Sequence, residues 1–521
     1  MFQLLQDRLE KLVAIDGHCL EGGARGIEKE SLRVTPAGHM SRESHPTALG
    51  AALTHPWITT DYAECLLEFV TPPVDTCWEA LQFLCDVHEF TYPRLPDDEL
   101  LWSASMPCLV SGDDSVPVAR YGDSNVGRMK HIYRLGLGYR YGRVMQTISG
   151  VHYNYSFSGR FWQALGEVEG EAGEDQAFRN RMYFALLRNF RRYGWLVLYL
   201  FGASPALCKT FLGGRDPGLP ELDPWTRHGP HATSLRMSDL GYRNTNQATV
   251  HPSMNTLPEY VADLEQAMRT PYPPYERIGT VVDGQWRQLS ANLLQIENEY
   301  YGHIRPKQPI FSGERPTHAL RRGGVAYVEV RALDVSPFDP VGVSQNELRF
   351  IEALLAFCML HESPSIDAGE LEQLDDNHGR VAVAGRRPGL RLAISGVERS
   401  VAEWGREICD LLEPICSLLD GEDPARSYSA SLEQQRAKFA DPSLTPSARI
   451  LDELSRENES FFAFAQRAAH RHREYFRALP PMSEAREAFF NRAVEESLAR
   501  RDEMEAAAQP AFEQYLRDYL A

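Results

Sequence analysis

Residues 26–34 read GIEKESLRV, and this short segment carries the pattern that decides the fold. Glu28 and Glu30 stand two residues apart. Because side chains alternate between the two faces of a β-strand, both carboxylates would lie on one face. The segment therefore predicts a strand with one apolar face and one face that holds chemical groups.

Three further segments show the same period of two. Each again separates apolar side chains from polar ones, so each predicts a strand of the same kind. The polar faces hold Glu68 in CLLEFVT (65–71), His152, Asn154 and Ser156 in SGVHYNYSF (149–157), and Glu329 and Arg331 in VAYVEVRALD (325–334).

Spacing alone leaves two interpretations of these polar faces open. Each strand by itself fits an antiparallel strand with one wet face. Taken together, four glutamates and one histidine on a single sheet face would repel one another unless cations neutralised them. Oxygen ligands with one histidine suit Mg²⁺ or Mn²⁺, whereas zinc prefers Cys and His, and the chain has no HExxH motif. Asp61, in WITTDYAE (57–64), offers a further ligand.

The sequence lacks the common phosphate-binding motifs of nucleotide-binding proteins. There is no GxxxxGK[ST] motif, and GLGYRYG at 136–142 has the wrong last spacing for a dinucleotide-binding loop. A nucleotide would therefore be held mainly through metal ions and arginine, with a sheet as the platform.

Composition excludes several classes of function. The chain has 521 residues, and 54 Lys+Arg against 72 Asp+Glu give a net charge of −18, which disfavours general nucleic-acid binding. The N-terminus has no signal-peptide pattern, and the most apolar stretch, 195–201, is too short to span a bilayer. The nine cysteines show no CxxC pair, which predicts buried, reduced thiols in a cytoplasmic protein.

Two regions of the chain differ in the spacing of their apolar residues. Residues 1–340 mix strand-like runs with helices and Gly/Pro-rich loops, whereas apolar residues recur at helical spacing from about residue 343 onward. We expect an α+β catalytic core over 1–340 and a mainly helical region over 341–521 that packs on the core.

Seven blocks in order along the chain resemble the bacterial glutamate–cysteine ligases of the glutathione pathway. The family resemblance implies a cupped, mainly antiparallel sheet of glutamine-synthetase-like type, with helices around it and a largely helical C-terminal half. The blocks are GIEKESLRV (26–34), ITTDYAECLLEFVTPP (58–73), YGDSNVGRMKHIYRLGLGYRYG (121–142), MQTISGVHYNYSF (145–157), SLRMSDLGY (234–242), ENEYYGHIRPK (297–307) and VEVRALDVSPFDP (328–340).

The resemblance also implies roles for individual residues. Arg331 looks like the arginine that binds the phosphoryl group during its transfer. Glu28 and Glu329 look like the other two catalytic residues. The metal-binding set that it implies is Glu28, Glu30, Asp61, Glu68, His152 and Glu329, and the substrate-binding set is Tyr133, Arg236, Tyr242, Tyr301 and Ile148.

Each of these residues has a plainer reading when it is taken alone. Tyr133 would be a packed helix tyrosine, Arg236 a surface ion-pair residue and Tyr301 a core aromatic. Glu329 and Arg331 would form an ion pair within one strand. The match of the whole motif, rather than any single residue, favours the functional roles.

A family member is expected to join the γ-carboxylate of glutamate to the amine of cysteine. The family consumes ATP with several Mg²⁺ ions (or Mn²⁺) and forms a γ-glutamyl phosphate, in the first step of glutathione biosynthesis. We expect a monomer that glutathione inhibits, with no nucleic-acid or membrane partner and, from the chain length, no fused glutathione-synthesising module. The alternatives are another carboxylate–amine ligase of the same superfamily and a catalytically silent relative.

Overall fold

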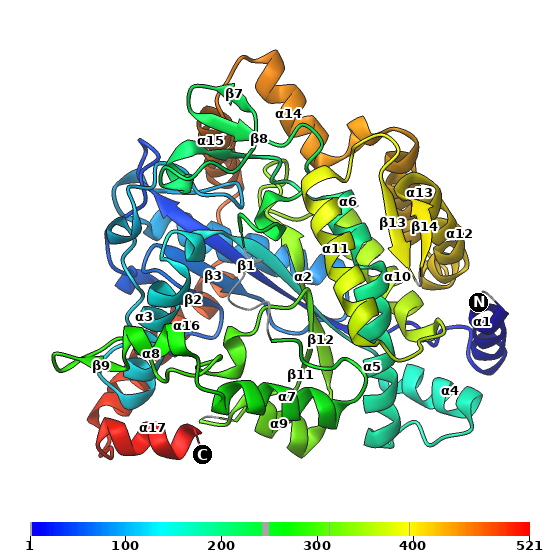
Figure 1. Ribbon diagram of the computed structural model, residues 1–521, viewed down its shortest axis with the longest axis horizontal. Helices are drawn as coiled ribbons and strands as arrows, with labels where there is room; N and C mark the ends of the chain where they lie inside the picture. The colour runs from blue at the N-terminus through cyan, green and yellow to red at the C-terminus, as the bar shows by residue number, and fades with distance from the viewer. Residues whose placement is uncertain (1–2, 242–249, 312, 395, 521) are drawn as a thin grey trace.

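The computed structural model describes residues 3–241, 250–311, 313–394 and 396–520, and its centre is one open antiparallel sheet (Figure 1). The strand order is β11-β12-β5-β1-β3-β2, and β4 pairs antiparallel with the C-terminal end of β1. The strands are β1 (Ala24–Val34), β2 (Ile58–Thr60), β3 (Leu66–Val70), β4 (Leu100–Leu101), β5 (Gly150–Ser156), β11 (Ile304–Lys307) and β12 (Tyr327–Asp334). The four strands predicted from alternation are confirmed, and they are neighbours in this sheet.

The register of the sheet brings the polar groups into adjacent positions. Glu28 lies opposite His152 of β5, and Glu30 lies opposite Glu68 of β3. Glu329 lies opposite Asn154, which is two residues from His152 along β5 and therefore on the same face. Because directly opposed side chains point to the same face, the polar groups of β12, β5, β1 and β3 form one continuous surface.

The other face of the sheet is apolar and packs on helices. Ile27, Phe69, Tyr153 and Val330 are fully buried there and belong to the largest hydrophobic core of the protein. The helices that contribute to this core include α2 (Cys77–Thr91), α5 (Gln176–Tyr193), α6 (Trp195–Phe201), α10 (Gln345–Leu360) and α12 (Val401–Asp420). The same core therefore joins the sheet to helices from both regions of the chain.

Helix α3 (Asn125–Tyr141) carries residues toward the polar face. It begins at Ser124, whose side chain accepts a hydrogen bond from the amide of Gly127. It ends at Gly142, where φ is +85°, a conformation that favours glycine. The helix thus presents the predicted block KHIYR (130–134) on a well-defined element.

The remaining elements surround this centre, and helices predominate beyond residue 340. No helix within the described residues has the length and apolarity needed to cross a membrane. The further α-helices are α1 (Gln3–Ile15), α4 (Gly159–Glu169), α7 (Leu257–Arg269), α8 (Pro273–Ile278), α9 (Pro316–Gly323), α11 (Ala368–Ala384), α13 (Ser427–Ala440), α14 (Pro446–Arg456), α15 (Phe461–Ala478), α16 (Glu484–Ala506) and α17 (Phe512–Leu520). The further strands are β6 (Ala206–Cys208), β7 (Glu221–Asp223), β8 (Thr226–His228), β9 (Val281–Val282), β10 (Gln285–Trp286), β13 (Arg391–Ile394) and β14 (Val397–Ser400).

The cysteine prediction needs a correction. Cys108 and Cys208 form a disulfide, and Cys85 is only half-buried, so the expectation of uniformly buried, reduced thiols is wrong for these three. The two bonded cysteines are 100 residues apart in sequence, and their side chains meet in a hydrophobic cluster beside the sheet. No local spacing reveals such a pair, because the fold alone brings the two segments together.

Candidate active site

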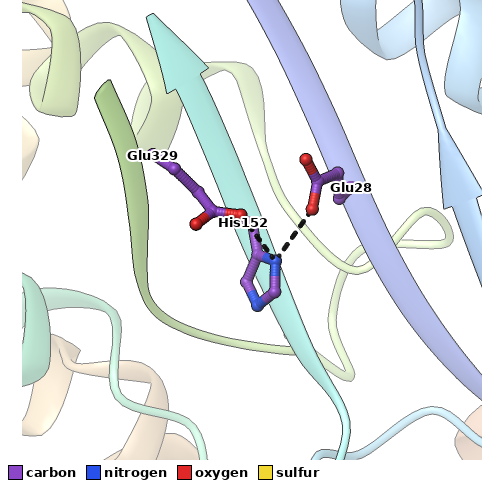
Figure 2. Close-up of side chains that lie close together, drawn as sticks. All are labelled: Glu28, His152 and Glu329. Atoms are coloured by element: carbon purple, nitrogen blue, oxygen red, sulfur yellow. Dashed lines mark hydrogen bonds and ion pairs between the residues drawn. The ribbon is translucent and has the colours of Figure 1, made fainter. Parts of the chain in front are cut away.

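Glu28, His152 and Glu329 form one compact group, which we call the Glu28 cluster, and Figure 2 shows their side chains converging from β1, β5 and β12. His152 Nδ1 lies 3.1 Å from Glu28 Oε2 and 3.7 Å from Glu329 Oε1. One ligand atom of each residue lies within 4.8 Å of the other two. Three donors at this spacing can share a single cation.

The Glu28 cluster holds two charged carboxylates and a neutral imidazole. Burial lowers the pKa of His152, and the nearby Arg331 charge lowers it further, so the imidazole keeps a free lone pair at neutral pH. Burial acts to raise the pKa of Glu329, but the charges of Lys307 and Arg331 outweigh it and hold that pKa well below the usual range. The pKa of Glu28 is also lowered, because its hydrogen bond with His152 helps to overcome burial and the charge of Glu329.

Glu30, Asp61 and Glu68 form a second group beside it, which we call the Glu68 cluster. Burial raises the pKa of Glu30 to about 8, and the neighbouring Asp61 charge contributes. Burial and the charges of Asp61 and Glu28 raise the pKa of Glu68 well above its usual range. Without a cation, Glu30 and Glu68 favour their protonated forms, and a bound divalent cation would replace those protons.

Basic side chains flank the Glu28 cluster on the β11–β12 side. Arg331 donates to Glu329 Oε1 at 3.1 Å, and Lys307 Nζ lies 3.1 Å from Glu329 Oε2. Arg305 stands directly opposite Glu329 in the β11–β12 register. Arg331 Nε is buried and has no acceptor among the described residues. An anion next to Glu329 would therefore meet several cationic groups at once.

Both clusters border one cavity of about 380 Å³, which we call the central cavity. Two predicted residues, Ile148 and Arg236, are fully buried and do not line this cavity, and Tyr242 lies outside the described residues. The predicted residues that line it are Glu28, Glu30, Asp61, Glu68, Tyr133, His152, Tyr301, Glu329 and Arg331.

Arg236 lies beneath the strand that carries Arg331. Its NH2 group donates to the backbone carbonyl of Arg331 at 3.1 Å, and its NH1 group lies 3.6 Å from Asp334 Oδ1. Gly150 makes room for it, because a Cβ at that position would lie 2.1 Å from Arg236 NH2. The surface ion-pair reading of Arg236 is therefore wrong, since the side chain is buried under β12.

Tyr133 and Tyr301 lie on two different walls of the central cavity. Tyr133 comes from α3, while Tyr301 follows the short 3-10 turn at Glu297–Glu299. The hydroxyl of Tyr301 donates to Met237 Sδ at 3.2 Å, and the guanidinium of Arg331 lies 5.6 Å from its ring centroid. The ring of Tyr301 thus lies beside Arg331, and Tyr133 adds a second aromatic side chain to the cavity lining.

Four basic residues that line the central cavity were not predicted from the sequence. Arg305 and Lys307 alternate in IRPK, and Lys130 and Arg134 stand four apart in KHIYR, so each pair shares one face of its element. Both pairs lie in blocks that resemble the family, 297–307 and 121–142, which also contain the predicted residues Tyr301 and Tyr133. Burial lowers the pKa of Lys130 to about 8, and Arg134 donates to the backbone carbonyl of Asp61. The basic groups thus occupy both ends of the acidic surface.

A buried acidic surface with one imidazole, flanked by basic groups and set on an antiparallel sheet, defines a class of enzyme. Oxygen-rich donor sets of this kind suit divalent cations of the Mg²⁺ type, and fixed cations beside them suit phosphoryl groups. The arrangement suits an enzyme that transfers a phosphoryl group with the help of divalent cations.

Comparison with known proteins gives the family. The family model "Glutamate-cysteine ligase" matches residues 9–381. Glutamate–cysteine ligases of Alcanivorax borkumensis and Pseudomonas putida are each 47% identical, over 99% and 100% of this chain and 99% of each relative. The structure of the Francisella tularensis glutamate–cysteine ligase in complex with AMP superposes with a TM-score of 0.90 at 37% identity, covering 96% of this chain and 98% of that one. The chain belongs to the glutamate–cysteine ligase family, which confirms the family, ligase class and mixed α+β fold that its motifs predicted.

Proposed function

We propose that the protein joins L-glutamate to L-cysteine through the γ-carboxylate, with conversion of ATP to ADP and phosphate. The product is γ-L-glutamyl-L-cysteine, the first intermediate of glutathione biosynthesis. The observation that carries this proposal is the Glu28 cluster beside Arg331 inside the central cavity, in a chain of this family. The reaction needs phosphate chemistry and two amino-acid sites, and this cavity offers both kinds of group.

The chemistry explains why acidic and basic groups stand together. A carboxylate is a poor electrophile, so a γ-carboxylate oxygen first attacks the γ-phosphorus of ATP, and the bond to ADP breaks. The cysteine amine then attacks the acyl carbon, the C–O bond to phosphate breaks and the amine loses a proton. Because two anions meet in the first step, charge neutralisation dominates the barrier.

The donor set supports Mg²⁺, with Mn²⁺ as a substitute. Glu28, His152 and Glu329 would hold one ion. Glu30, Asp61 and Glu68 would hold at least one more, since burial and the neighbouring Asp61 charge raise the pKa of both Glu30 and Glu68 and a cation would offset that cost. When bound, such ions neutralise the phosphate oxygens and the substrate carboxylate.

Arg331 is the proposed partner of the transferring phosphoryl group. Its NH1 group contacts Glu329, while Nε is buried without an acceptor among the described residues. A planar guanidinium can therefore turn one edge toward Glu329 and another toward the equatorial oxygens of the phosphoryl group. Glu28 and Glu329 complete the catalytic group by holding the cation next to Arg331.

The proposed amino-acid site lies in front of Tyr133 and Tyr301. Both rings line the central cavity, and a small aromatic-walled pocket separates similar side chains such as those of cysteine and alanine by about 1–3 kcal/mol. Arg236 and Ile148 would act on the substrates from their buried positions by shaping the strand and the wall behind this pocket. Tyr242, also proposed for this site, lies outside the described residues.

The finer features of the enzyme belong to the same proposal. We propose a glutamine-synthetase-like cupped sheet, a catalytic core over 1–340 with the helical region 341–521 packed on it, and a cytoplasmic monomer. The shared hydrophobic core of sheet and helices supports the packing of the two regions. Glutathione contains the γ-glutamylcysteine unit, so it would inhibit by overlapping the substrate sites.

One assay tests the activity directly. ADP release from ATP is measured with glutamate and Mg²⁺ present, while the amine is cysteine, 2-aminobutyrate, alanine or none. We expect the highest kcat/KM with cysteine, a lower value with 2-aminobutyrate, and little release with alanine or without an amine. Preference for another amine, or release that ignores the amine, would contradict the proposal.

A further inference from the structure

A fully buried ion pair joins α3 to the segment that carries Tyr301. Arg140 NH1 lies 2.7 Å from Glu299 Oε1, and both side chains are 0% exposed. The hydroxyl of Tyr141 donates to the same oxygen at 2.7 Å. Arg140 lies in the last turn of α3, and Glu299 is the last residue of the 3-10 turn Glu297–Glu299. Because separating two buried charges is strongly unfavourable, the pair holds these two elements together.

The other oxygen of Glu299 is connected to Tyr133 through Gln295. Glu299 Oε2 accepts a hydrogen bond from the backbone amide of Gln295 at 2.7 Å. The side-chain amide of Gln295 donates to the carbonyl of Tyr133 at 3.2 Å, and its Oε1 accepts from the amide of Leu289 at 2.9 Å. Gly136 leaves room for this side chain on α3, because a Cβ there would lie 2.2 Å from Gln295 Oε1. Both carboxylate oxygens of Glu299 therefore connect its turn to α3.

Arg140 is the centre of this network. Its Nε donates to Gln288 Oε1 at 3.0 Å, and its NH2 group donates to the carbonyl of Ser290 at 2.6 Å. The guanidinium also lies 4.1 Å from the ring centroid of Tyr275 in α8. A guanidinium offers five N–H donors in one plane, so a single side chain can hold several segments at once. Arg140 thus anchors residues 288–299 against the end of α3.

The two anchored elements carry the two tyrosines of the central cavity. Tyr133 precedes Arg140 by seven residues, which is about two helical turns, so both side chains lie on the same side of α3. Tyr301 follows Glu299 by two residues. Both tyrosines line the central cavity, whereas Arg140 does not. The contact between Arg140 and Glu299 therefore joins the elements on which Tyr133 and Tyr301 stand.

The network requires a carboxylate at position 299. Oε1 of Glu299 accepts hydrogen bonds from Arg140 and Tyr141, and Oε2 accepts one from Gln295. A carboxylate has two accepting oxygens, whereas a glutamine side chain has one oxygen and an NH2 group that only donates. In Glu299→Gln the NH2 group would face a donor, so at least one of the two connections to α3 would break.

We propose that Glu299 is a positioning residue that sets the spacing between Tyr133 and Tyr301. This spacing lets the pocket select cysteine over amines of similar size. The inference rests on the proposed function in one respect, namely that the two tyrosines border the site of the amine substrate. A pocket that separates similar small side chains depends on close contacts, so a small displacement of one wall weakens the selection.

The test compares cysteine with 2-aminobutyrate, in which a methyl group replaces the thiol. The ratio of the two kcat/KM values, here called the amine ratio, is measured at saturating ATP, Mg²⁺ and glutamate. We expect the amine ratio of Glu299→Gln to be about fivefold or more below that of the wild type, because the pocket loses its fixed width. A general loss of folded protein would lower both kcat/KM values equally and leave the amine ratio unchanged.

Gln295→Leu is a second variant, which guards against a folding defect in Glu299→Gln. It changes no charge and removes the contact with the carbonyl of Tyr133. We expect the amine ratio to fall about threefold or more, since one neutral hydrogen bond is lost. The two changes made together should lower the amine ratio by less than the product of their separate effects, because both break the same connection.

Glu297→Gln is the matched control, because it alters another buried ion pair of the same 3-10 turn. Glu297 Oε1 accepts hydrogen bonds from Arg315 Nε at 3.0 Å and from the hydroxyl of Thr317. These contacts connect the turn to α9 rather than to α3, and Glu297 does not line the central cavity. We expect this variant to lose stability and to keep the amine ratio within about twofold of the wild type.

The outcomes separate this inference from the proposed function. An amine ratio within about twofold of the wild type in either Gln295→Leu or folded Glu299→Gln would overturn the positioning role. An equal fall of the amine ratio in Glu297→Gln would overturn it as well, while γ-glutamylcysteine still formed. A wild-type protein that formed no γ-glutamylcysteine would overturn the proposed function instead.

Discussion

Glu28 and His152 face each other directly across β1 and β5, with His152 Nδ1 3.1 Å from Glu28 Oε2. Asn154 donates to the other oxygen of Glu28 at 2.8 Å, so the carboxylate is held from two positions on the same strand. Since burial lowers the pKa of His152, the pair presents one charged oxygen donor and one neutral nitrogen donor in fixed positions. Such preorganised ligands hold a cation without reorganisation of the sheet.

Replacement of Glu28 by Gln should separate activity from stability. The amide keeps the size of the side chain but loses the charge that would bind the cation, so kcat should fall on the order of 10²–10³-fold. The thermal midpoint should fall only slightly, because the lowered pKa of Glu28 means that its charge is favoured in the folded protein, while the amide keeps the size and hydrogen-bonding capacity of the side chain. Steady-state kinetics and calorimetry on the same preparation test this; a normal kcat would remove Glu28 from the catalytic group.

Replacement of Glu352 should lower the stability of the protein and leave substrate binding unchanged. Glu352 is fully buried on the far side of the sheet, paired with Arg25 and hydrogen-bonded by Tyr428 at 2.9 Å. Glu352→Ala leaves the Arg25 charge buried and unpaired, which costs about 3–5 kcal/mol of unfolding free energy. Chemical denaturation should show that loss, while KM values of the folded enzyme stay near wild type. A stability loss below about 1 kcal/mol would show that Arg25 finds another partner.

The stability of the metal-free protein should fall as the pH rises. Glu30 has a pKa of about 8 in the folded protein, well above its ordinary value, so the folded state keeps a proton that the unfolded chain releases. This contribution is complete below the ordinary glutamate pKa and is lost as the pH rises through about 8; it amounts to at most about 5 kcal/mol.

Thermal midpoints in EDTA at pH 5.5, 7 and 8 measure this effect. We expect a decline with pH in the wild type, a shallower decline in Glu30→Gln, and recovery at pH 8 on addition of Mg²⁺. Activity should vanish in EDTA and return with Mg²⁺ or Mn²⁺. A pH-independent midpoint, or full turnover in EDTA, would contradict the assignment of the two acidic clusters to cations.

Replacement of Arg331 by Lys tests whether the guanidinium acts in phosphoryl transfer. Lysine keeps the charge but loses the planar fork, so we expect kcat to fall on the order of 10²-fold or more with only a small change in ATP affinity. Nucleotide binding by calorimetry, beside steady-state rates, separates the two effects. An unchanged kcat would leave Arg331 as an ion-pair partner of Glu329, which it contacts at 3.1 Å.

Much of the sheet could be predicted because its signals are local. Alternation within GIEKESLRV and VAYVEVRALD depends on one segment at a time, and the structure has both as strands, β1 and β12. The position of Glu28 opposite His152 depends on the register between two strands whose paired residues are 124 apart in sequence, which the family resemblance implied and spacing did not.

Other features had no local signal. The Cys108–Cys208 disulfide and the contact of Arg315 with both Glu297 and Leu520 join distant segments through tertiary structure. Arg305 and Lys307 do have a local signal, since they alternate in IRPK, but a strand of only four residues does not show by itself that its basic face borders a site. Buried polar atoms such as Glu297 Oε2 become apparent only once burial and hydrogen bonds are known.

The most direct test of the account follows oxygen from glutamate to phosphate. We propose that the γ-carboxylate accepts the phosphoryl group of ATP, because the cavity holds a group of residues that could bind a cation and Arg331 beside it. Glutamate labelled with ¹⁸O in its γ-carboxylate is incubated with ATP, Mg²⁺ and cysteine, and the released phosphate is analysed by mass spectrometry. We expect one labelled oxygen in each phosphate released with γ-glutamylcysteine. Unlabelled phosphate formed at the same rate as γ-glutamylcysteine would contradict it.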